Sequence, residues 1–275
     1  MTDEAAPKRP RKRRGLIRVI VYGTLIGAFW GFWVWQPWEI DIIERSAPRP
    51  NPKIAPEPDR LFSKGTKVLI VTAHPDDSEF YVGGTLAKLR DAGAEIWQVI
   101  VTDGDKAYYG PLTDAKKNRE VRRQESIEAA KSWGGKNLVI LGYPDGRLKN
   151  SDRLVERLRV EIEKFQPEYV MGFDYDFPPR MSHKDHRIAG QATAIAVEKA
   201  PSVRWLMRIS TAQPNYVVDI SDYWPEKEKM LAIHASQFKE KLDRIVGMVQ
   251  NRAVEDGEII GTTYGEGFRV IQMKQ

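Results

Sequence analysis

The chain has 275 residues, and its 43 basic residues outnumber its 38 acidic residues by five. This length allows one globular domain and an additional segment. No cysteine is present, which excludes disulfide bonds, thiolate metal ligands and a cysteine nucleophile.

The basic excess is confined to the amino-terminal tail. Residues 1–18 contain seven basic and two acidic side chains, which account for the whole net charge of +5. The rest of the chain is neutral overall, so its charge gives no reason to expect a nucleic-acid partner.

An uncharged stretch, Val19–Trp38, follows this tail. As a helix it would rise about 30 Å, enough to cross the hydrocarbon core of a membrane. Tryptophans near its distal end are typical of a membrane interface. A cleaved signal peptide is the alternative, but the apolar run is long for one and no good A-x-A site follows. We therefore expect a basic cytoplasmic tail over residues 1–15 and an uncleaved transmembrane anchor over residues 16–38.

The distribution of charge around this anchor also predicts its orientation. Basic residues precede the span and acidic residues follow it. The positive-inside rule then places the amino terminus in the cytoplasm and the catalytic domain on the outer face, periplasmic or extracellular, of the cell membrane. Residues 39–65 are rich in proline and predict an extended, semi-rigid stalk.

Residues 66–275 alternate between predicted strands and helices. Apolar runs predict strands over residues 68–73, 95–102, 137–141 and 168–173, and amphipathic patterns predict helices over residues 80–92, 115–133 and 152–165. Further along, we expect a helix from 187 to about 199, a strand at 216–220, mostly helix over 225–249 and a terminal strand at 268–273. This alternation favours an α/β fold with a Rossmann-like, mostly parallel sheet and flanking helices.

The segment His74-Pro75-Asp76-Asp77 comes directly after the first of these strands. In an open α/β sheet, ligands bind beyond the carboxyl ends of the strands. Two adjacent carboxylates are unfavourable neighbours there unless a cation compensates their charge. The alternative is an Asp-rich turn in which Asp77 caps the following helix.

A second histidine cluster follows the fourth predicted strand, at Ser182-His183-Lys184-Asp185-His186. Three of the four histidines of the chain lie in these two short segments. In order and composition, the two segments resemble the AHPDD and HPDH motifs of the PIG-L/LmbE family of zinc-dependent N-acetylglucosamine de-N-acetylases. Weaker matches are Arg122-x-x-Glu125, Asp145-Gly146, His234-Ala-Ser-Gln237 and Glu266-Gly-Phe268. Lys184 departs from the pattern, because the family usually has proline there.

The resemblance implies a role for each residue of the two motifs. The metal ligands would be His74, Asp77 and His186, and Asp76 would be the general base. A protonated His183 would stabilise the oxyanion, and Asp185 would support His183 and raise its pKa. The implied metal is Zn²⁺, although two imidazoles and a carboxylate also suit Fe²⁺ or another divalent metal.

Three residues, one of them in the second motif, leave more than one interpretation open. By resemblance, Arg122 lies near the active site and binds substrate, whereas the pattern alone favours an exposed ion pair with Glu125. His183 could be only a helix cap or turn residue. His234 lies in a predicted helix, where a structural histidine is expected.

The resemblance implies a membrane-anchored, metal-dependent hydrolase with an N-acetylated, GlcNAc-type amino sugar as substrate. It would remove the N-acetyl group from this sugar in a glycolipid, glycan or glycoconjugate. An amidase for another N-acyl conjugate is one alternative, and a non-catalytic glycan-binding module of the envelope is another. The sequence does not indicate an oligomeric state.

Overall fold

The computed structural model describes residues 40–42, 58, 60–106, 114–179 and 181–274. The predicted tail and anchor, residues 1–38, and most of the predicted stalk lie outside this range and stay predictions. Within the described residues, no helix combines the length and apolar character needed to cross a membrane.

The core of the fold is a seven-stranded sheet in the order β4-β3-β2-β5-β7-β9-β8. The first five strands of this order are parallel to one another, and β9 runs antiparallel to both β7 and β8. The predicted α/β fold with a mostly parallel sheet is therefore confirmed. The strands are β2 (Lys67–Thr72), β3 (Glu95–Thr102), β4 (Gly135–Tyr143), β5 (Tyr169–Phe173), β7 (Trp205–Ile209), β8 (Tyr216–Asp219) and β9 (Gly265–Gln272).

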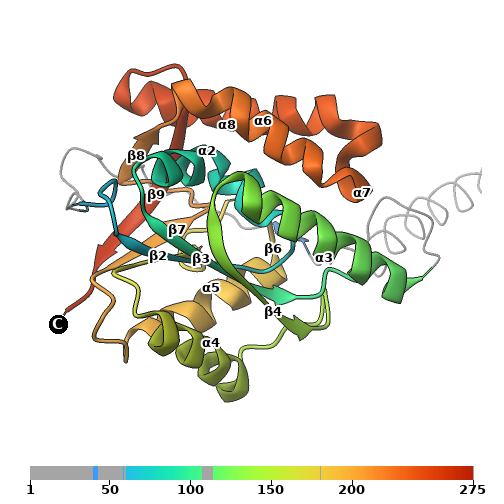
Figure 1. Ribbon diagram of the computed structural model, residues 1–275, viewed down its shortest axis with the longest axis vertical. Helices are drawn as coiled ribbons and strands as arrows, with labels where there is room; N and C mark the ends of the chain where they lie inside the picture. The colour runs from blue at the N-terminus through green and yellow to red at the C-terminus, as the bar shows by residue number, and fades with distance from the viewer. Residues whose placement is uncertain (1–39, 43–57, 59, 107–113, 180, 275) are drawn as a thin grey trace, which may run out of the picture. The chain divides into compact units, whose positions relative to one another are not determined.

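Helices cover both faces of the sheet, with α4 and α5 together on one face and α2 and α6 on the other (Figure 1). This double cover explains why the central strands have continuous apolar runs, since both faces are buried. The helices are α2 (Asp77–Asp91), α3 (Ala115–Ser132), α4 (Asp152–Phe165), α5 (Lys184–Val197), α6 (Trp224–Ile233), α7 (Ala235–Phe238) and α8 (Leu242–Ile260).

The strand order creates a switch point between β2 and β5. From β2 the chain proceeds outward to β3 and β4, whereas from β5 it proceeds in the other direction to β7. Ligands of open α/β sheets bind at such a point, beyond the carboxyl ends of the two strands. The first histidine motif follows β2 and the second follows β5, so the topology brings the two motifs to one crevice.

Within the main sheet and its helices, three elements differ from the sequence-based prediction. Strand β7 was not predicted, because Arg208 interrupts its apolar pattern. Helix α5 begins at Lys184 rather than after Arg187, so the second motif opens a helix instead of lying in a loop. The helical segment over 225–249 consists of α6, the single turn α7 and α8, which extends to Ile260.

A short strand, β1 (Ile40–Ile42), pairs antiparallel with β6 (Met181–His183) in a separate two-stranded sheet. It lies within the predicted stalk, where proline-rich composition favours unpaired backbone. Leu61, near the end of the same segment, is buried in the core. Ile40–Ile42 and Leu61, both within the predicted stalk, therefore contact the rest of the described chain.

Helix α2 is kinked at Val82, whose φ of −139° and ψ of 22° are not helical. The kink leaves backbone N–H groups unpaired, and the carboxylate of Glu266 on β9 accepts from Gly84 at 3.0 Å and from Thr85 at 2.7 Å. Lys227 pairs with the same buried carboxylate at 2.5 Å. This pair holds the first turn of α2, which begins at the first motif, at a defined angle to the rest of the helix.

Candidate metal and catalytic site

Three side chains of the two motifs converge at the switch point. His74 Nδ1 lies 3.1 Å from His186 Nε2, and His186 Nε2 lies 3.1 Å from Asp77 Oδ1. Their ligand atoms all lie within 4.8 Å of one another. Two imidazole nitrogens and one carboxylate are the donor set of a three-ligand catalytic metal site.

Asp77 is held in place by the backbone of its own loop. Its Oδ2 accepts hydrogen bonds from the N–H groups of Ala73 at 3.0 Å and His74 at 2.7 Å, which leaves Oδ1 directed toward His186. Burial alone raises the pKa of Asp77, but the neighbouring imidazoles His186 and His74 outweigh it and hold this pKa well below its usual value. The helix-capping alternative is wrong, because Asp77 bonds to the preceding residues and α2 has no side-chain cap.

His186 lies in the first turn of α5, and its ring is fixed by an aromatic neighbour. It stacks on Phe173 at the end of β5, with ring centroids 4.0 Å apart and an interplanar angle of 3°. The imidazole is therefore held in one orientation by packing as well as by its polar contacts.

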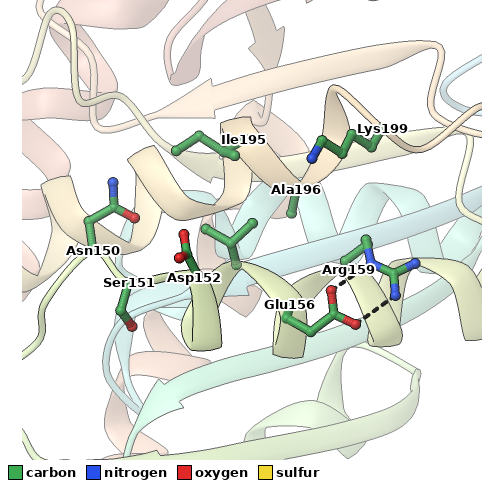
Figure 2. Close-up of a pocket in the computed structure, with 9 residues that line it drawn as sticks. Asn150, Ser151, Asp152, Glu156, Arg159, Ile195, Ala196 and Lys199 are labelled. Atoms are coloured by element: carbon green, nitrogen blue, oxygen red, sulfur yellow. Dashed lines mark hydrogen bonds and ion pairs between the residues drawn. The ribbon is translucent and has the colours of Figure 1, made fainter.

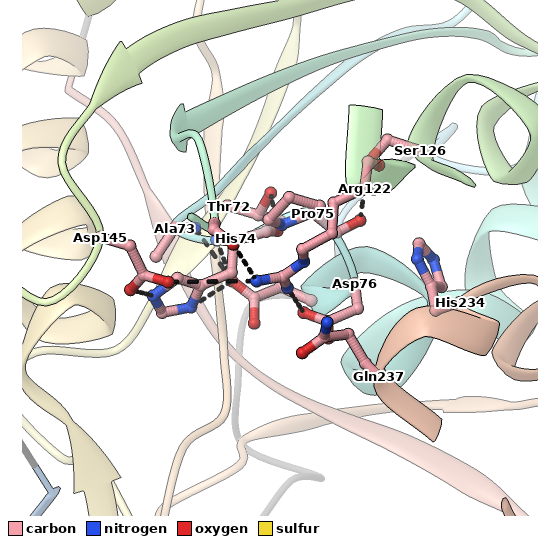
Figure 3. Close-up of polar contacts among 12 residues, drawn as sticks. Thr72, Ala73, His74, Pro75, Asp76, Arg122, Ser126, Asp145, His234 and Gln237 are labelled. Atoms are coloured by element: carbon pink, nitrogen blue, oxygen red, sulfur yellow. Dashed lines mark hydrogen bonds and ion pairs between the residues drawn. The ribbon is translucent and has the colours of Figure 1, made fainter. Parts of the chain in front are cut away.

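Asp76, next to Asp77, points toward Arg122 instead of toward the three converging side chains (Figure 3). Its Oδ1 lies 3.2 Å from Arg122 Nη2, and Arg122 Nη1 donates to the carbonyl of Gly104 at 2.8 Å. The guanidinium is buried, whereas Asp76 is half-buried. Glu125 accepts instead from the backbone and hydroxyl of Ser236. An exposed ion pair between Arg122 and Glu125 is therefore ruled out.

His183 is the N-cap residue of α5, and its Nδ1 accepts a hydrogen bond from the backbone N–H of Asp185 at 3.1 Å. Burial, with smaller effects from His74 and His186, lowers the pKa of His183 to about 3. This direction opposes the expected protonation of His183, which stays a prediction. A neutral ring that accepts at Nδ1 carries its hydrogen on Nε2, so His183 can still donate one hydrogen bond.

The carboxylate of Asp185 does not support His183 by a hydrogen bond, contrary to the expectation from resemblance. It accepts from the backbone N–H of Gly146 at 2.7 Å and of Leu148 at 3.2 Å. Its charge does raise the pKa of His183, but burial of the ring outweighs this effect. Asp185 thus fastens the start of α5 to the loop that follows β4.

That loop brings a residue to the site that the sequence did not single out for a role. Asp145 Oδ1 lies 3.1 Å from His74 Nε2, and its Oδ2 lies 4.0 Å from Arg122 Nη1 (Figure 3). Its position just beyond β4, at the edge where the parallel strands end, was the available signal.

The surroundings of His74 are strongly anionic. Burial lowers the pKa of this imidazole, but the carboxylates of Asp77, Asp145 and Asp185 together raise it well above the usual value. The same field favours any cation in contact with these groups. The residues present therefore fit a divalent metal.

The site opens into a cavity of about 310 Å³. Five polar residues of its lining are here called the catalytic floor: His74, Asp76, Asp77, His183 and His186. Four apolar residues of its lining are here called the apolar wall: Phe80, Phe238, Ile245 and Met248. Met248 is 51% exposed. The cavity thus offers a polar reacting centre beside an apolar surface.

A second hollow of about 540 Å³ lies between α4 and α5, where Glu156 and Arg159 form an ion pair (Figure 2). It is larger than the motif cavity, but none of the predicted site residues lines it. Volume alone therefore does not identify the reactive site.

His234 is structural, as expected. It is buried, and its Nε2 lies 2.9 Å from Glu79 Oε2. Glu79 Oε1 accepts from Trp133 Nε1 at 2.7 Å, so both carboxylate oxygens are occupied away from the metal ligands.

Known proteins share both the sequence and the fold of this chain. The PIG-L family, described as GlcNAc-PI de-N-acetylase, matches residues 69–197. The diacetylchitobiose deacetylase of Thermococcus kodakarensis is 28% identical over 227 residues, which cover 76% of this chain and 85% of the relative. A probable N-acetyl-alpha-D-glucosaminyl L-malate deacetylase 2 of Bacillus cereus is 27% identical over 202 residues, which cover 67% of this chain and 90% of the relative.

One solved structure extends this similarity to three dimensions. The N,N'-diacetylchitobiose deacetylase of Pyrococcus horikoshii, complexed with its inhibitor MPG, has a TM-score of 0.71 and 31% identity to this chain. The match covers 78% of this chain and 86% of that one. The chain therefore belongs to the PIG-L family of deacetylases, enzymes that act on N-acetyl amide bonds.

Proposed function

We propose that this protein is a zinc-dependent hydrolase that removes the acetyl group from the nitrogen of a GlcNAc-type amino sugar. The observation that carries the proposal is the different placement of the two adjacent aspartates of the first motif. Asp77 belongs to a three-residue ligand set, whereas the adjacent Asp76 lies outside it and faces the cavity beside Arg122. A glycan-binding module would have no need of a second carboxylate beside a metal site.

His74, Asp77 and His186 would hold the metal. When bound, a divalent metal supplies a Lewis acid that polarises the acetamide carbonyl and makes water more acidic. Zinc suits two imidazoles and one carboxylate, and Fe²⁺ accepts the same ligands.

The residues around the ligands carry the proton transfers and the stabilisation of charge. Asp76 takes the proton of the attacking water, and Arg122 holds its carboxylate in one orientation through the 3.2 Å ion pair. His183 donates from Nε2 to the carbonyl oxygen as negative charge develops there. Asp76 then returns the proton to the departing nitrogen, and the products are acetate and a free amino sugar.

The apolar wall bears on what the sugar is attached to. An apolar surface lies in the same cavity as the reacting centre and is formed by Phe80, Phe238, Ile245 and Met248. A free polar sugar would leave this apolar surface exposed to water. We therefore favour a glycolipid, or another glycoconjugate with an apolar substituent, as the substrate.

A deacetylation screen tests the proposed function. The purified protein would be incubated with free N-acetylglucosamine, its methyl and octyl glycosides and a lipid-linked N-acetylhexosamine, and acetate would be quantified. Metal content would be measured on the same sample before and after chelation, with zinc or iron added back. We expect acetate release that chelation abolishes and one of these metals restores. A metal-loaded protein that releases no acetate from any N-acetylhexosamine, but cleaves another N-acyl conjugate, would overturn the choice of substrate.

The predicted anchor at residues 16–38 places this reaction at the cell membrane, with the domain on the outer face. Protease added to intact cells, after permeabilisation of any outer layer, should cut within the predicted stalk and release the domain. Protection of the stalk until the inner membrane is broken would reverse the proposed orientation and favour a substrate on the cytoplasmic side.

A further inference from the structure

We infer that Glu125 is a positioning residue for substrate selectivity, because it holds the single turn α7 in the place that brings Phe238 into the apolar wall. This role accounts for Glu125 and Ser236, which belong to two of the weaker sequence matches and take no part in the proposed reaction. It rests on the proposed function insofar as the wall contacts the group attached to the sugar.

Helix α7 has only four residues, and an isolated turn of this length is unstable, because few hydrogen bonds offset the ordering of its backbone. The N–H groups at its start also need acceptors. The carbonyl of His234 accepts from the N–H groups of Gln237 and Phe238, both at 3.0 Å. The side chain of His234, the N-cap residue, does not cap the helix. The N–H of Ser236 therefore depends on an acceptor from another part of the chain.

Glu125 of α3 supplies this acceptor. Its Oε1 accepts from the backbone N–H of Ser236 at 2.7 Å, and its Oε2 accepts from the hydroxyl of the same residue at 2.6 Å. A carboxylate that accepts from the second residue of a helix does what an N-cap side chain does, and its charge is favourable at a helix amino terminus. Glu125 thus completes a helix end that the local sequence leaves open.

The α7 segment is also attached to α2. The Nε2 atom of His234 lies 2.9 Å from Glu79 Oε2, on the helix that begins at the first motif. One attachment to α2 and another to α3 fix the rotation of the turn as well as its position. Phe238, at the end of the turn, is 6% exposed and lines the cavity with Ile245 and Met248. Because α7 is a single turn, a change at its beginning also moves this ring.

The face of α3 that carries Glu125 also holds the first motif. Arg122, Glu125 and Ser126 are three and four positions apart, so they project from one side of the helix. Arg122 Nη2 lies 3.2 Å from Asp76 Oδ1, and Ser126 Oγ donates to the carbonyl of Pro75 at 3.2 Å (Figure 3). Helix α3 therefore joins the proposed base to the wall, and Glu125 is the attachment on the side of the wall.

The test compares two substrates that differ only in the group attached to the sugar, the octyl and methyl glycosides of N-acetylglucosamine. In Glu125→Ala, the ratio of kcat/KM for the octyl glycoside to that for the methyl glycoside should fall about fivefold, because Phe238 loses part of its contact with the octyl chain. Bound metal should stay stoichiometric, since the ligand set lies elsewhere. Hydrogen exchange of the peptide that contains residues 235–238 should become faster, because the turn has lost its cap.

Further variants identify the contact that is responsible. Glu125→Gln keeps an oxygen for the backbone N–H and an amide donor for the hydroxyl oxygen of Ser236, so it should retain a ratio close to that of wild type. Ser236→Ala loses one of the two hydrogen bonds and should have a smaller effect than Glu125→Ala. Glu128→Ala is the matched control and should behave as wild type, because Glu128 is an exposed carboxylate three positions further along the same helix.

An unchanged ratio or unchanged hydrogen exchange in Glu125→Ala would overturn the inference, and so would a failure of Glu125→Gln to restore the ratio. If Glu125→Ala does not fold, Ser236→Ala decides, and a ratio equal to that of wild type would then overturn it. A wild-type protein that deacetylates both glycosides equally well would also overturn it, but would leave the proposed deacetylase activity standing.

A wild-type protein that releases acetate from neither glycoside would instead refute the proposed function. Calorimetry with octyl glucoside and methyl glucoside, which contain no acetyl group, then decides the inference. Weaker binding of octyl glucoside to Glu125→Ala than to wild type would support it, and equal binding would overturn it.

Discussion

The catalytic floor and the apolar wall face the same cavity but are built differently. Every floor residue lies within residues 69–197, the range that matches the PIG-L family. Three of the four wall residues, Phe238, Ile245 and Met248, come from α7 and α8, beyond that range. Under the proposed function, the reacting residues and most of the wall thus come from separate parts of the chain.

The two sides also differ in how their side chains are held. Floor residues are fixed by directional contacts, such as the two backbone hydrogen bonds to Asp77 and the stacking of His186 on Phe173. The wall is held by packing, and Met248 is half exposed. Directional contacts suit chemistry that tolerates little displacement, whereas a flexible thioether can adapt to differently shaped apolar groups.

The largest effect is expected from loss of a floor ligand. His186→Ala should reduce turnover to background, because two ligands do not retain the metal. The same change also removes the stacking of His186 on Phe173 inside the domain. We therefore expect a lower melting temperature as well. Metal analysis of the folded variant is the measurement, and stoichiometric metal would remove His186 from the ligand set.

Asp76→Asn should have the next largest effect. It leaves the three ligands in place but removes the proposed proton acceptor, so kcat should fall about 10²-fold to 10⁴-fold with metal still bound. Asp77→Asn is the comparison, because it should lose metal. Near-normal turnover of metal-loaded Asp76→Asn would end the assignment of Asp76 as general base.

A change in the wall should alter selectivity rather than chemistry. Met248→Ala removes part of the apolar surface, and partial loss of one such contact is worth about 1 kcal/mol, or roughly fivefold. We expect kcat/KM for an octyl N-acetylglucosaminide to fall by about that factor, and that for the methyl glycoside to change little. Val254→Ala, on the same helix but away from the cavity, is the control. An equal loss with both glycosides would show that the wall does not select the aglycone.

The smallest effect on turnover is expected at a buried ion pair outside the floor and the wall. His234, between α6 and α7, pairs with Glu79 on α2. Burial lowers the pKa of His234, but Glu79, with contributions from Asp76 and Glu125, outweighs burial and raises it. His234→Gln should reduce stability by about 1–3 kcal/mol, because a buried partner loses its charged hydrogen bond.

The pH dependence of this loss has a definite sign. A raised pKa in the folded state contributes stability that is fully present below the unfolded value of about 6.5. This contribution disappears as the pH rises through the higher folded value. The free energy of unfolding in urea should therefore differ less between wild type and His234→Gln as the pH rises. Any contribution of bound metal is the same in both proteins and cancels from this difference. A difference that grows with pH would contradict a charged His234.

Local pattern predicted the central part of this protein well. The spacing of apolar residues along the chain predicts strands and helices directly. It identified the buried runs that form β2, β3 and β5 and the amphipathic segment that forms α4. The adjacency of the two histidine motifs also followed from the sequence, because the carboxyl ends of parallel strands meet at one edge of a sheet. Strand β7 was missed, since its burial depends on the neighbours that cover it.

The sequence alone indicated the type of chemistry, because two segments that combine histidine with aspartate follow buried strands and resemble the two motifs of the family. The contacts that direct that chemistry came only from the tertiary structure. Asp145 reaches His74 across 71 positions of the chain, Asp185 bonds to the β4–α4 loop instead of to His183, and α8 supplies a wall beside the reacting centre. Each depends on how separate elements pack against one another, and hydrogen bonds between distant segments leave no periodic trace in the sequence.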